Sequence, residues 1–167
     1  LSILSIPNAL QVAIELNSLS KSHNMAGWRV GMLAAAEERI NEIICFKSNM
    51  DSGMFMPIQL AAIEALQLGK NWFNALNNIY FNRRKLAFKL LDILNCTYSS
   101  NQVGLFVWAK IPPNYSDGYF FSDFILQNYR IFITPGGIFG DNGNYYIRVS
   151  LCCTEENFNE AINRIKL

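Results

Sequence analysis

The order of apolar and polar residues predicts a chain that mixes strands and helices. Apolar and polar residues alternate over 12–17, which indicates a strand, and the pattern over 28–36 indicates a second strand after a polar turn at 18–24. Two strands alone would be marginally stable in water. We therefore expect this pair to form part of a larger sheet.

Helical periodicity dominates the middle of the chain. Residues 37–48 begin with two glutamates, where the helix dipole favours negative charge, and residues 57–68 begin with a proline and end before Gly69. Apolar residues then recur at steps of three and four over 72–94. This predicts one long helix that begins at a cap formed by Asn71.

The pattern changes again after residue 95. It predicts strands and helices in alternation, with strands at 103–111, 131–134 and 144–151 and helices at 117–128 and from a Thr154 cap to the end of the chain. Elements in this order indicate an α+β arrangement of one sheet and its covering helices.

Composition adds two constraints. Hydrophobic residues make up 51% of the chain and charged residues 16%, which is a more apolar composition than a free-standing domain usually has. We therefore expect a missing segment or a second subunit to cover part of the apolar surface. The net charge of +1 gives no field that would draw the chain to nucleic acid. The basic run 83–85 is interpreted as a solvated helix face.

Cysteine and histidine usage excludes several kinds of site. The chain has four cysteines, Cys45, Cys96, Cys152 and Cys153, and they include no C-x-x-C pair. This favours buried, reduced thiols in a cytoplasmic protein and argues against a zinc site. His23 is the single histidine, so a His-rich metal site is excluded and no metal is expected.

Neither a membrane span nor a targeting segment is expected. No apolar run approaches the ~18 residues of a membrane-spanning helix. Residues 1–13 are apolar but lack a basic n-region and contain Pro7, so they are not interpreted as a signal peptide. The first residue is Leu1 and not Met, from which we expect the chain to be part of a longer protein.

The segment 17–31 is the one that suggests chemistry. Lys21 is surrounded by short polar side chains, and Arg29 follows at the start of the second predicted strand. A lysine that attacks a carbonyl must be held in place with a reachable amine. Hydroxyls from Ser18 and Ser20 and the forked guanidinium of Arg29 are donors suited to a phosphate. On residue types alone, a polar turn with an incidental lysine remains an equal alternative.

The order of residues in 18–31 is more specific. Ser-x-Ser-Lys-x-x-x-Met-x-Gly-Trp-Arg-x-Gly resembles the lysine signature of fold-type I, class I/II aminotransferases, which use pyridoxal phosphate (PLP). The resemblance implies that Lys21 forms the Schiff base with the cofactor and moves the α-proton of the substrate. It also implies that Ser18 and Arg29 bind the cofactor phosphate, with Ser20 as a helper.

Three further segments are similar to the same family. Residues 133–150, with Thr-Pro-Gly-Gly-Ile-Phe-Gly and Tyr-Ile-Arg, resemble its C-terminal segment, which implies that Arg148 binds the substrate α-carboxylate. Residues 102–112 resemble a strand of its small domain, and residues 47–55 resemble the loop that reaches the neighbouring subunit's active site. The glycines over 136–143 match neither a dinucleotide fingerprint nor a P-loop.

The resemblance implies an α/β fold, the type I PLP-dependent transferase fold. Residues 1–57 would be the end of the large PLP-binding domain and residues 58–167 the small α+β domain. The implied activity is transfer of an amino group between an amino acid and a 2-oxo acid by a homodimer. The residues of these motifs are similar to those of bacterial LL-diaminopimelate and aspartate aminotransferases. Dicarboxylate-specific enzymes have an arginine in the loop that corresponds to 49–57, but this loop contains Met54, Phe55 and Met56 and no arginine.

The resemblance covers less than half of a family chain. The acidic partner of the cofactor's ring nitrogen and the N-terminal phosphate loop would lie outside this sequence, so the fragment alone is not expected to transaminate. Two alternatives stay open. One is a PLP-dependent β-lyase of the same fold, and the other is a structural or dimerisation unit without activity.

Overall fold

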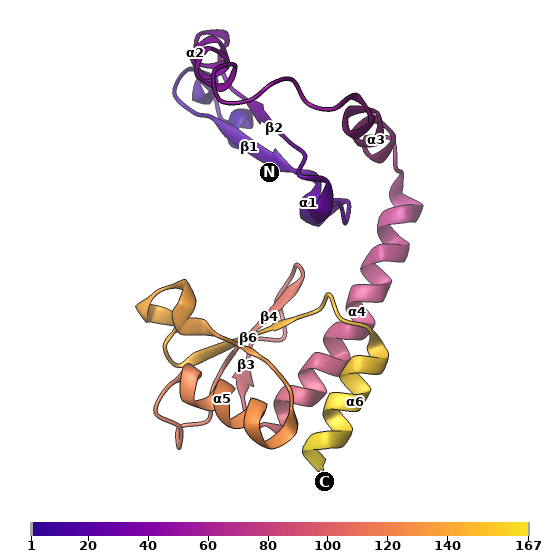
Figure 1. Cartoon of the computed structure of the whole chain (residues 1–167), viewed down its shortest axis with the longest axis vertical. Helices are drawn as coiled ribbons and strands as arrows, with labels where there is room; N and C mark the ends of the chain where they lie inside the picture. Colours follow the sequence, from indigo (N-terminus) through magenta and orange to yellow (C-terminus); the bar gives the residue numbers. More distant parts are fainter. Residues whose placement is uncertain (1, 167) are drawn as a thin grey trace. The chain divides into compact units, whose positions relative to one another are not determined.

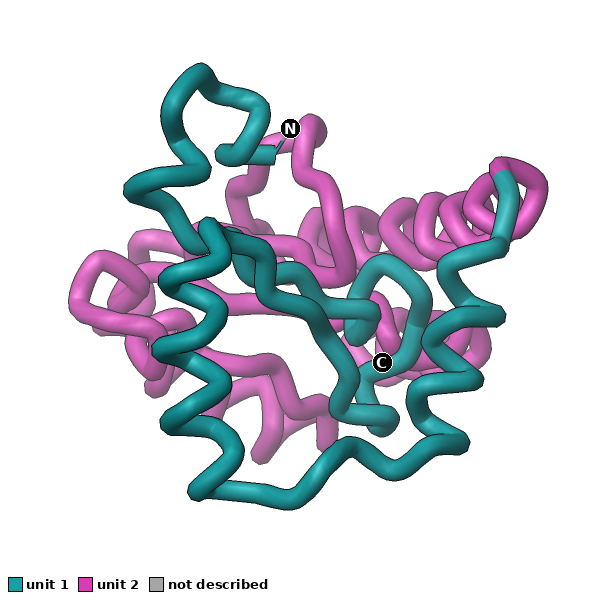
Figure 2. The backbone as a smooth tube through the Cα atoms, turned by 90° about the horizontal axis from the view of Figure 1, so that it is seen from above, with its two compact units in different colours: residues 1–69 teal, residues 70–167 magenta. Residues whose placement is uncertain are grey.

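The computed structural model describes residues 2–166, which divide into two units, Leu1–Gly69 and Lys70–Leu167 (Figure 2). This division by packing differs from the boundary after residue 57 that the sequence suggested. The helix that follows residue 55 shares a small apolar cluster with the residues before it, and therefore belongs to unit 1. Each unit is described by itself.

Unit 1 contains one antiparallel hairpin and three helices (Figure 1). Its elements are β1 (Glu15–Ser18), α1 (Leu19–Ser22), β2 (Gly31–Ala34), α2 (Glu37–Lys47) and α3 (Met56–Leu66), with single 3-10 turns η1 (Ile3–Ser5), η2 (Ala9–Gln11) and η3 (Ala26–Trp28). The strands pair from Glu15 opposite Ala34 to Ser18 opposite Gly31. Both strands are shorter than predicted, because residues 12–14, 29–30 and 35–36 do not pair in the hairpin and Trp28 lies in η3.

Unit 2 is a four-stranded antiparallel sheet with three helices. Its elements are α4 (Lys70–Ile93), β3 (Thr97–Tyr98), β4 (Phe106–Lys110), α5 (Gly118–Tyr129), β5 (Thr134–Pro135), η4 (Gly136–Phe139), η5 (Asp141–Gly143), β6 (Tyr146–Ser150) and α6 (Glu155–Lys166). The strand order is β3-β4-β6-β5, so β4 and β6 are central. Helices α4 and α6 lie side by side (Figure 1).

The two faces of the central strands differ in burial. Val107 and Ala109 of β4 and Ile147 and Val149 of β6 are buried in one core with residues of α4, α5 and α6. Side chains alternate between the faces of a strand, so the intervening residues of both strands lie on the other face, where they are half-buried or exposed. One of these residues is Arg148.

Two arginines of α4 correct the interpretation of the basic run as a solvated face. Arg83 and Arg84 are half-buried. Arg83 Nη1 donates to the carbonyl of Leu151 at 3.1 Å, and Arg84 Nη2 donates to the carbonyl of Gly104 at 2.8 Å. Because these carbonyls lie just after β6 and just before β4, the arginines tie the helix to one end of the strand pair. Only Lys85 of the run is exposed.

The cysteines also depart from expectation. All four are free thiols, but only Cys96 is buried, and burial raises its pKa to about 12. Cys45 and Cys152 are exposed and Cys153 is half-buried. Among residues 2–166, no helix is both long enough and apolar enough to cross a membrane.

Candidate active site

The segment around Lys21 is a capped helical turn. Ser18 ends β1 in an extended conformation, and its Oγ accepts a hydrogen bond from the backbone N–H of Ser20 at 3.1 Å. The same hydroxyl donates to Ser20 Oγ at 2.9 Å, and Ser22 Oγ donates to the carbonyl of Ser18 at 3.2 Å. These local bonds fix Lys21 within one turn of helix. Lys21 therefore lies in α1 and not in a strand, and most of the preceding strand β1 is exposed.

Three apolar residues anchor this loop. Leu19, Met25 and Val30 are each 8% exposed, and they pack with residues of α3: Ile58, Ala61, Ala62 and Ala65. Backbone bonds join the anchors to one another, since Leu19 N–H donates to the Val30 carbonyl and Met25 N–H to the Leu19 carbonyl, both at 3.3 Å. The loop is therefore positioned by its apolar residues, while Lys21 and Arg29 are exposed.

Arg29 lies between η3 and β2, where the chain re-enters the hairpin. It adopts the left-handed conformation, with φ 52° and ψ 45°, which is uncommon for a residue other than glycine. Its Nη1 donates to the carbonyl of Ala26 at 2.9 Å, so the guanidinium lies along its own loop. A Cβ at Gly31 would lie 2.6 Å from the carbonyl oxygen of Asn17, so the close pairing of the two strands at this end requires glycine.

The structure thus brings four of the five site residues from the sequence onto one loop. Ser18, Ser20, Lys21 and Arg29 all belong to the connection between β1 and β2 or to its ends. A cavity of about 470 Å³ beside this loop is lined by Asn24, Gly27, Trp28, Arg29 and Ile58. Hydroxyl, amine and guanidinium donors on one exposed loop can bind an anion, and the amine can react with a carbonyl.

The fifth residue, Arg148, belongs to unit 2. It lies on β6, where Trp108 of β4 and Thr134 of β5 are its partners across the sheet. Its guanidinium carbon lies 4.2 Å from the ring centroid of Phe106 and 4.2 Å from that of Phe139. Its Nε is buried and has no hydrogen-bond partner within the described residues. A half-buried cation without a paired carboxylate is suited to bind an anionic ligand.

The glycine-rich segment between β5 and β6 has a packing role. The turns η4 and η5 lie against each other. A Cβ at Gly136 would lie 2.5 Å from the carbonyl oxygen of Gly143, so the two turns can approach this closely only with glycine. This approach fixes the segment that ends in Phe139, one of the two rings beside Arg148. Residues 2–166 contain no group of three His, Cys, Asp or Glu residues that could hold a metal ion.

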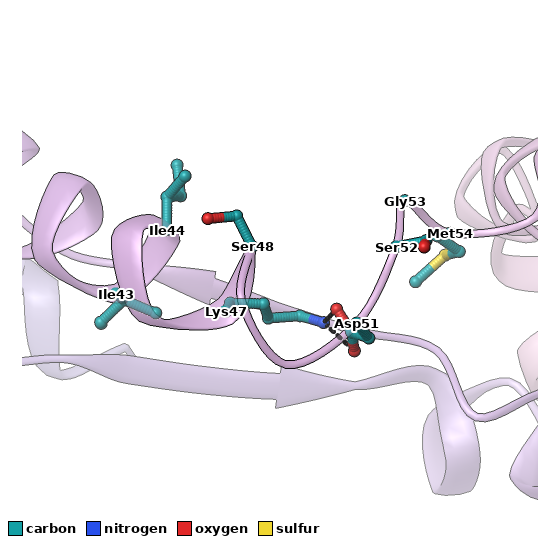
Figure 3. A pocket seen from close by; sticks show the side chains of 8 residues that line it. All are labelled: Ile43, Ile44, Lys47, Ser48, Asp51, Ser52, Gly53 and Met54. Carbon is teal, nitrogen blue, oxygen red and sulfur yellow. Dashed lines mark hydrogen bonds and ion pairs between the residues drawn. The ribbon is translucent and has the colours of Figure 1, made fainter.

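The loop after α2 forms a second cavity in unit 1 (Figure 3). Lys47 Nζ and the Asp51 carboxylate form an ion pair at 2.5 Å across the turn that ends the helix. Ser48, Ser52, Gly53 and Met54 line the cavity with Ile43 and Ile44. Both partners of the ion pair are exposed, so solvent screens the pair and it contributes little to stability.

Comparison with known proteins identifies the family. The family model described as aminotransferase class I and II matches residues 6–165. The chain belongs to this family. Class I and II aminotransferases are PLP-dependent, and the α/β fold matches fold-type I aminotransferase structures over part of their length.

Several relatives of this aminotransferase chain are similar along its whole length. LL-diaminopimelate aminotransferase of Oleidesulfovibrio alaskensis is 40% identical over 99% of this chain, and that of Natranaerobius thermophilus is 37% identical over 98%. A substrate-bound BacF structure from Bacillus subtilis has a TM-score of 0.89 and 34% identity over 99% of this chain. An aromatic aminotransferase structure from Pyrococcus horikoshii has a TM-score of 0.89 and 28% identity over 99%.

The matched chains are longer than this aminotransferase chain. It spans 42% of the length of both curated relatives, 42% of the BacF chain and 44% of the Pyrococcus chain. Sequence reasoning missed the anchoring role of Met25 and the rings that contact Arg148. A methionine at a fixed place in the lysine motif was visible in the sequence, but its burial depends on α3 and could not be inferred from the motif.

Proposed function

We propose that this chain supplies part of the active site of a PLP-dependent aminotransferase, which moves an amino group between an amino acid and a 2-oxo acid. A protein of the relatives' full length is called the full-length enzyme below. The observation that carries the proposal is the set of donors on the loop from Ser18 to Gly31. The loop presents an exposed amine, two hydroxyls that are hydrogen-bonded to each other, and a guanidinium. These groups are suited to bind a cofactor that has a carbonyl and a phosphate.

Each residue of that loop has a role in the proposal. Lys21 holds the cofactor through its side-chain amine, and its Nζ accepts and returns the α-proton of the substrate. Ser18 and Arg29 bind the phosphate, and Ser20, whose Oγ accepts a hydrogen bond from Ser18, helps to orient the Ser18 hydroxyl. Bound PLP supplies an electron sink for the bond that breaks at the α-carbon.

Arg148 is the proposed anchor for the substrate α-carboxylate. A guanidinium offers two parallel N–H donors that match a carboxylate, so it sets the orientation of the amino acid as well as its affinity. The absence of any hydrogen bond or ion pair of Arg148 among the described residues supports this role, since Arg83 and Arg84, which support the fold, each donate to a backbone carbonyl.

The proposed setting of the enzyme is a homodimer in the cytoplasm, with no nucleic-acid or membrane partner. Four free thiols support a reducing compartment. The loop over 47–55 is proposed to reach the neighbouring subunit's active site, and its exposed Met54 and Phe55 support an apolar contact there. The proposed domains are the end of a large PLP-binding domain, residues 1–57, and a small domain, residues 58–167.

The names of the relatives guide the choice of substrate. Both curated relatives are called LL-diaminopimelate aminotransferase, so LL-diaminopimelate is the first amino donor to test, in a step of amino-acid biosynthesis. These names also favour amino transfer over the β-lyase alternative. Pyruvate release from a donor with a β-leaving group, in the absence of any 2-oxo acid, would contradict this choice.

Borohydride reduction of the full-length enzyme with PLP tests the proposal. Reduction fixes the cofactor on the lysine that holds it, and peptide mapping then identifies that lysine. We expect the label on Lys21 and its loss, with the yellow colour, in Lys21→Ala. Lys89→Ala, which removes an exposed lysine from α4, should keep both. A label on any other lysine would contradict the assignment.

A further inference from the structure

The contacts of Arg148 differ from those of the other half-buried arginines of unit 2. Arg83 and Arg84 each donate to a backbone carbonyl, and those bonds fix their side chains. The Nε atoms of all three arginines are buried without a partner. Terminal N–H donors of Arg83 and Arg84 are fixed by the carbonyls, but among residues 2–166 no hydrogen bond or ion pair fixes the terminal nitrogens of Arg148. Its contacts with two aromatic rings are therefore what holds it in place.

The first ring, Phe106, is positioned by the sheet. Trp108 pairs with Arg148 across β4 and β6, and Phe106 precedes Trp108 by two residues on the same strand. Residues two apart lie on the same face, so Phe106 is a diagonal neighbour of Arg148. The centroid of its ring lies 4.2 Å from the guanidinium carbon.

The second ring, Phe139, lies on η4 and contacts the ring of Trp108. It lies 4.2 Å from the guanidinium carbon of Arg148 and 6.0 Å from the ring of Trp108, with the rings inclined at 60°. Trp108 stacks on Tyr146 at 5.5 Å and 18°. Phe139 is thus part of a row of rings that follows the face carrying Arg148.

We propose that Phe106 and Phe139 are positioning residues that hold the guanidinium of Arg148 in the orientation needed to bind a carboxylate. The inference rests on the proposed function, in which Arg148 binds the α-carboxylate of the substrate. Ring faces attract a cation without consuming its N–H donors, whereas a hydrogen bond to a carbonyl would consume one. The two rings therefore orient the arginine and leave its terminal nitrogens for the ligand.

Phe139→Leu and Phe106→Leu in the full-length enzyme test this inference, because leucine keeps apolar volume and removes the aromatic face. We expect each variant to raise KM for amino-acid donors about tenfold, the size of a partly desolvated cation–π contact, with kcat changed less than about twofold. The inhibition constant of an unreactive monocarboxylate should weaken by a similar factor. Amines without a carboxylate should be unaffected, as should PLP absorbance and the melting temperature.

Two matched variants complete the design. Phe132→Leu removes an exposed phenylalanine of unit 2 whose ring forms no cation–π contact with Arg148, and should leave KM unchanged. Phe139→Tyr retains the aromatic face and should restore KM to near the wild-type value. A structural role for the ring would also be restored by tyrosine, so the split between carboxylates and amines is the deciding readout.

The possible failures are distinguishable. If Arg148→Lys raises KM for amino acids but both leucine variants behave as wild type, the positioning role is wrong and the proposed function stands. If Arg148→Lys affects amino acids and carboxylate-free amines equally, the proposed function of Arg148 fails, and the inference fails with it. Leucine variants that lose stability and slow both classes of substrate equally would show that the rings only support the sheet.

Discussion

The two units of this chain differ in how much of their apolar surface they bury themselves. Unit 2 has one core cluster of 17 buried residues, whereas the cluster of unit 1 has four. Among the described residues, 17 of the 27 large hydrophobic residues that are exposed lie in unit 1. Unit 2 can therefore be stabilised by its own core, and unit 1 depends on further protein to cover it. This agrees with a chain that spans 42% of its relatives.

The proposed site residues follow the same division. Lys21 and Arg29 lie on a loop that is fixed by short local bonds and three anchors. Arg148 lies on a central strand whose opposite face is packed in the core. Groups on a rigid strand keep their position with little help, whereas groups on a loop depend on what packs beneath them. The cofactor end of the site should therefore be more sensitive to loss of packing than the substrate end.

Core truncations in the two units give the largest expected effect. Phe121→Ala removes a side chain of α5 that is 1% exposed, and should lower the free energy of unfolding by about 3–5 kcal/mol. Leu19→Ala removes an anchor from the four-residue cluster, where neighbours can collapse, and should cost about 2 kcal/mol, the low end for such truncations, while weakening PLP binding. Urea unfolding and PLP titration measure the two quantities.

This pair of variants can overturn the comparison. Equal losses of stability would show that unit 1 is packed as tightly as unit 2. A Leu19→Ala variant with wild-type PLP affinity would show that the apolar anchor does not position the lysine loop. Ala65→Gly, which thins the same cluster from α3, is the independent check on that second conclusion.

The helices show how far the sequence predicted the fold. The predicted helix at 37–48 is α2, and that at 57–68 is α3, because acidic first-turn residues and Pro57 mark their starts. The long apolar stripe predicted α4, although the helix begins at Lys70 and the Asn71 cap is wrong. Steps of three and four persist over many residues, and a local pattern of that length is hard to mistake.

The short strands were less predictable. β3 has two residues and no alternation to detect, and the strand predicted at 131–134 is limited to β5, which begins at Thr134. The Ile133 carbonyl instead accepts a hydrogen bond from the buried hydroxyl of Ser122. Tertiary contacts decide such segments. For the same reason the motifs led to Lys21 and Arg148 but not to the rings of residues distant in sequence that contact the arginine.

Arg148→Lys in the full-length enzyme tests the rigid substrate end of the site. Lysine offers a point charge where two parallel donors are needed, so kcat/KM should fall about 100-fold or more for all amino donors. PLP and its colour should be retained, because the cofactor donors lie in unit 1. Steady-state kinetics with several donors measures the effect. Arg130→Lys, at an exposed position in unit 2, is the control. A variant that loses PLP would assign Arg148 a structural role.

Arg29→Ala tests the cofactor end. A charge-assisted hydrogen bond left unmade costs about 1.5–3 kcal/mol, so PLP affinity should fall roughly 10- to 150-fold. Pyridoxal, which lacks the phosphate, should bind nearly as well as to the wild type. Arg39→Ala, which removes an exposed arginine of α2 paired with Glu42, should change neither affinity. Equal losses for both cofactors would mean that Arg29 supports the loop and not the phosphate.

Helix capping extends the comparison to a smaller scale. In unit 2, Asp117 accepts from the N–H of Phe120 at 2.8 Å at the start of α5, and Thr154 accepts from Asn157 at 3.4 Å at the start of α6. In unit 1, neither Ala36 before α2 nor Phe55 before α3 forms a side-chain cap. Side-chain caps thus begin two helices of unit 2, whereas in unit 1 the two longer helices lack them and the single turn α1 is capped by Ser18.

The pH dependence of the Asp117 cap is the smallest expected effect. The backbone N–H of Phe120 is the main cause that lowers the pKa of Asp117 below its ordinary value. A group whose pKa is lower in the folded state stabilises the fold at pH values above its pKa in the unfolded state, which is about 3.9 for aspartate. This contribution is lost as the pH falls through the lower pKa of the folded state. Asp117→Asn keeps a capping side chain without a titrating charge. The wild type should therefore be slightly more stable than Asp117→Asn at neutral pH, and the difference should vanish in acid. Urea unfolding at a series of pH values measures it, and a difference that persists below the folded pKa would show that the charge of Asp117 does not act through the cap.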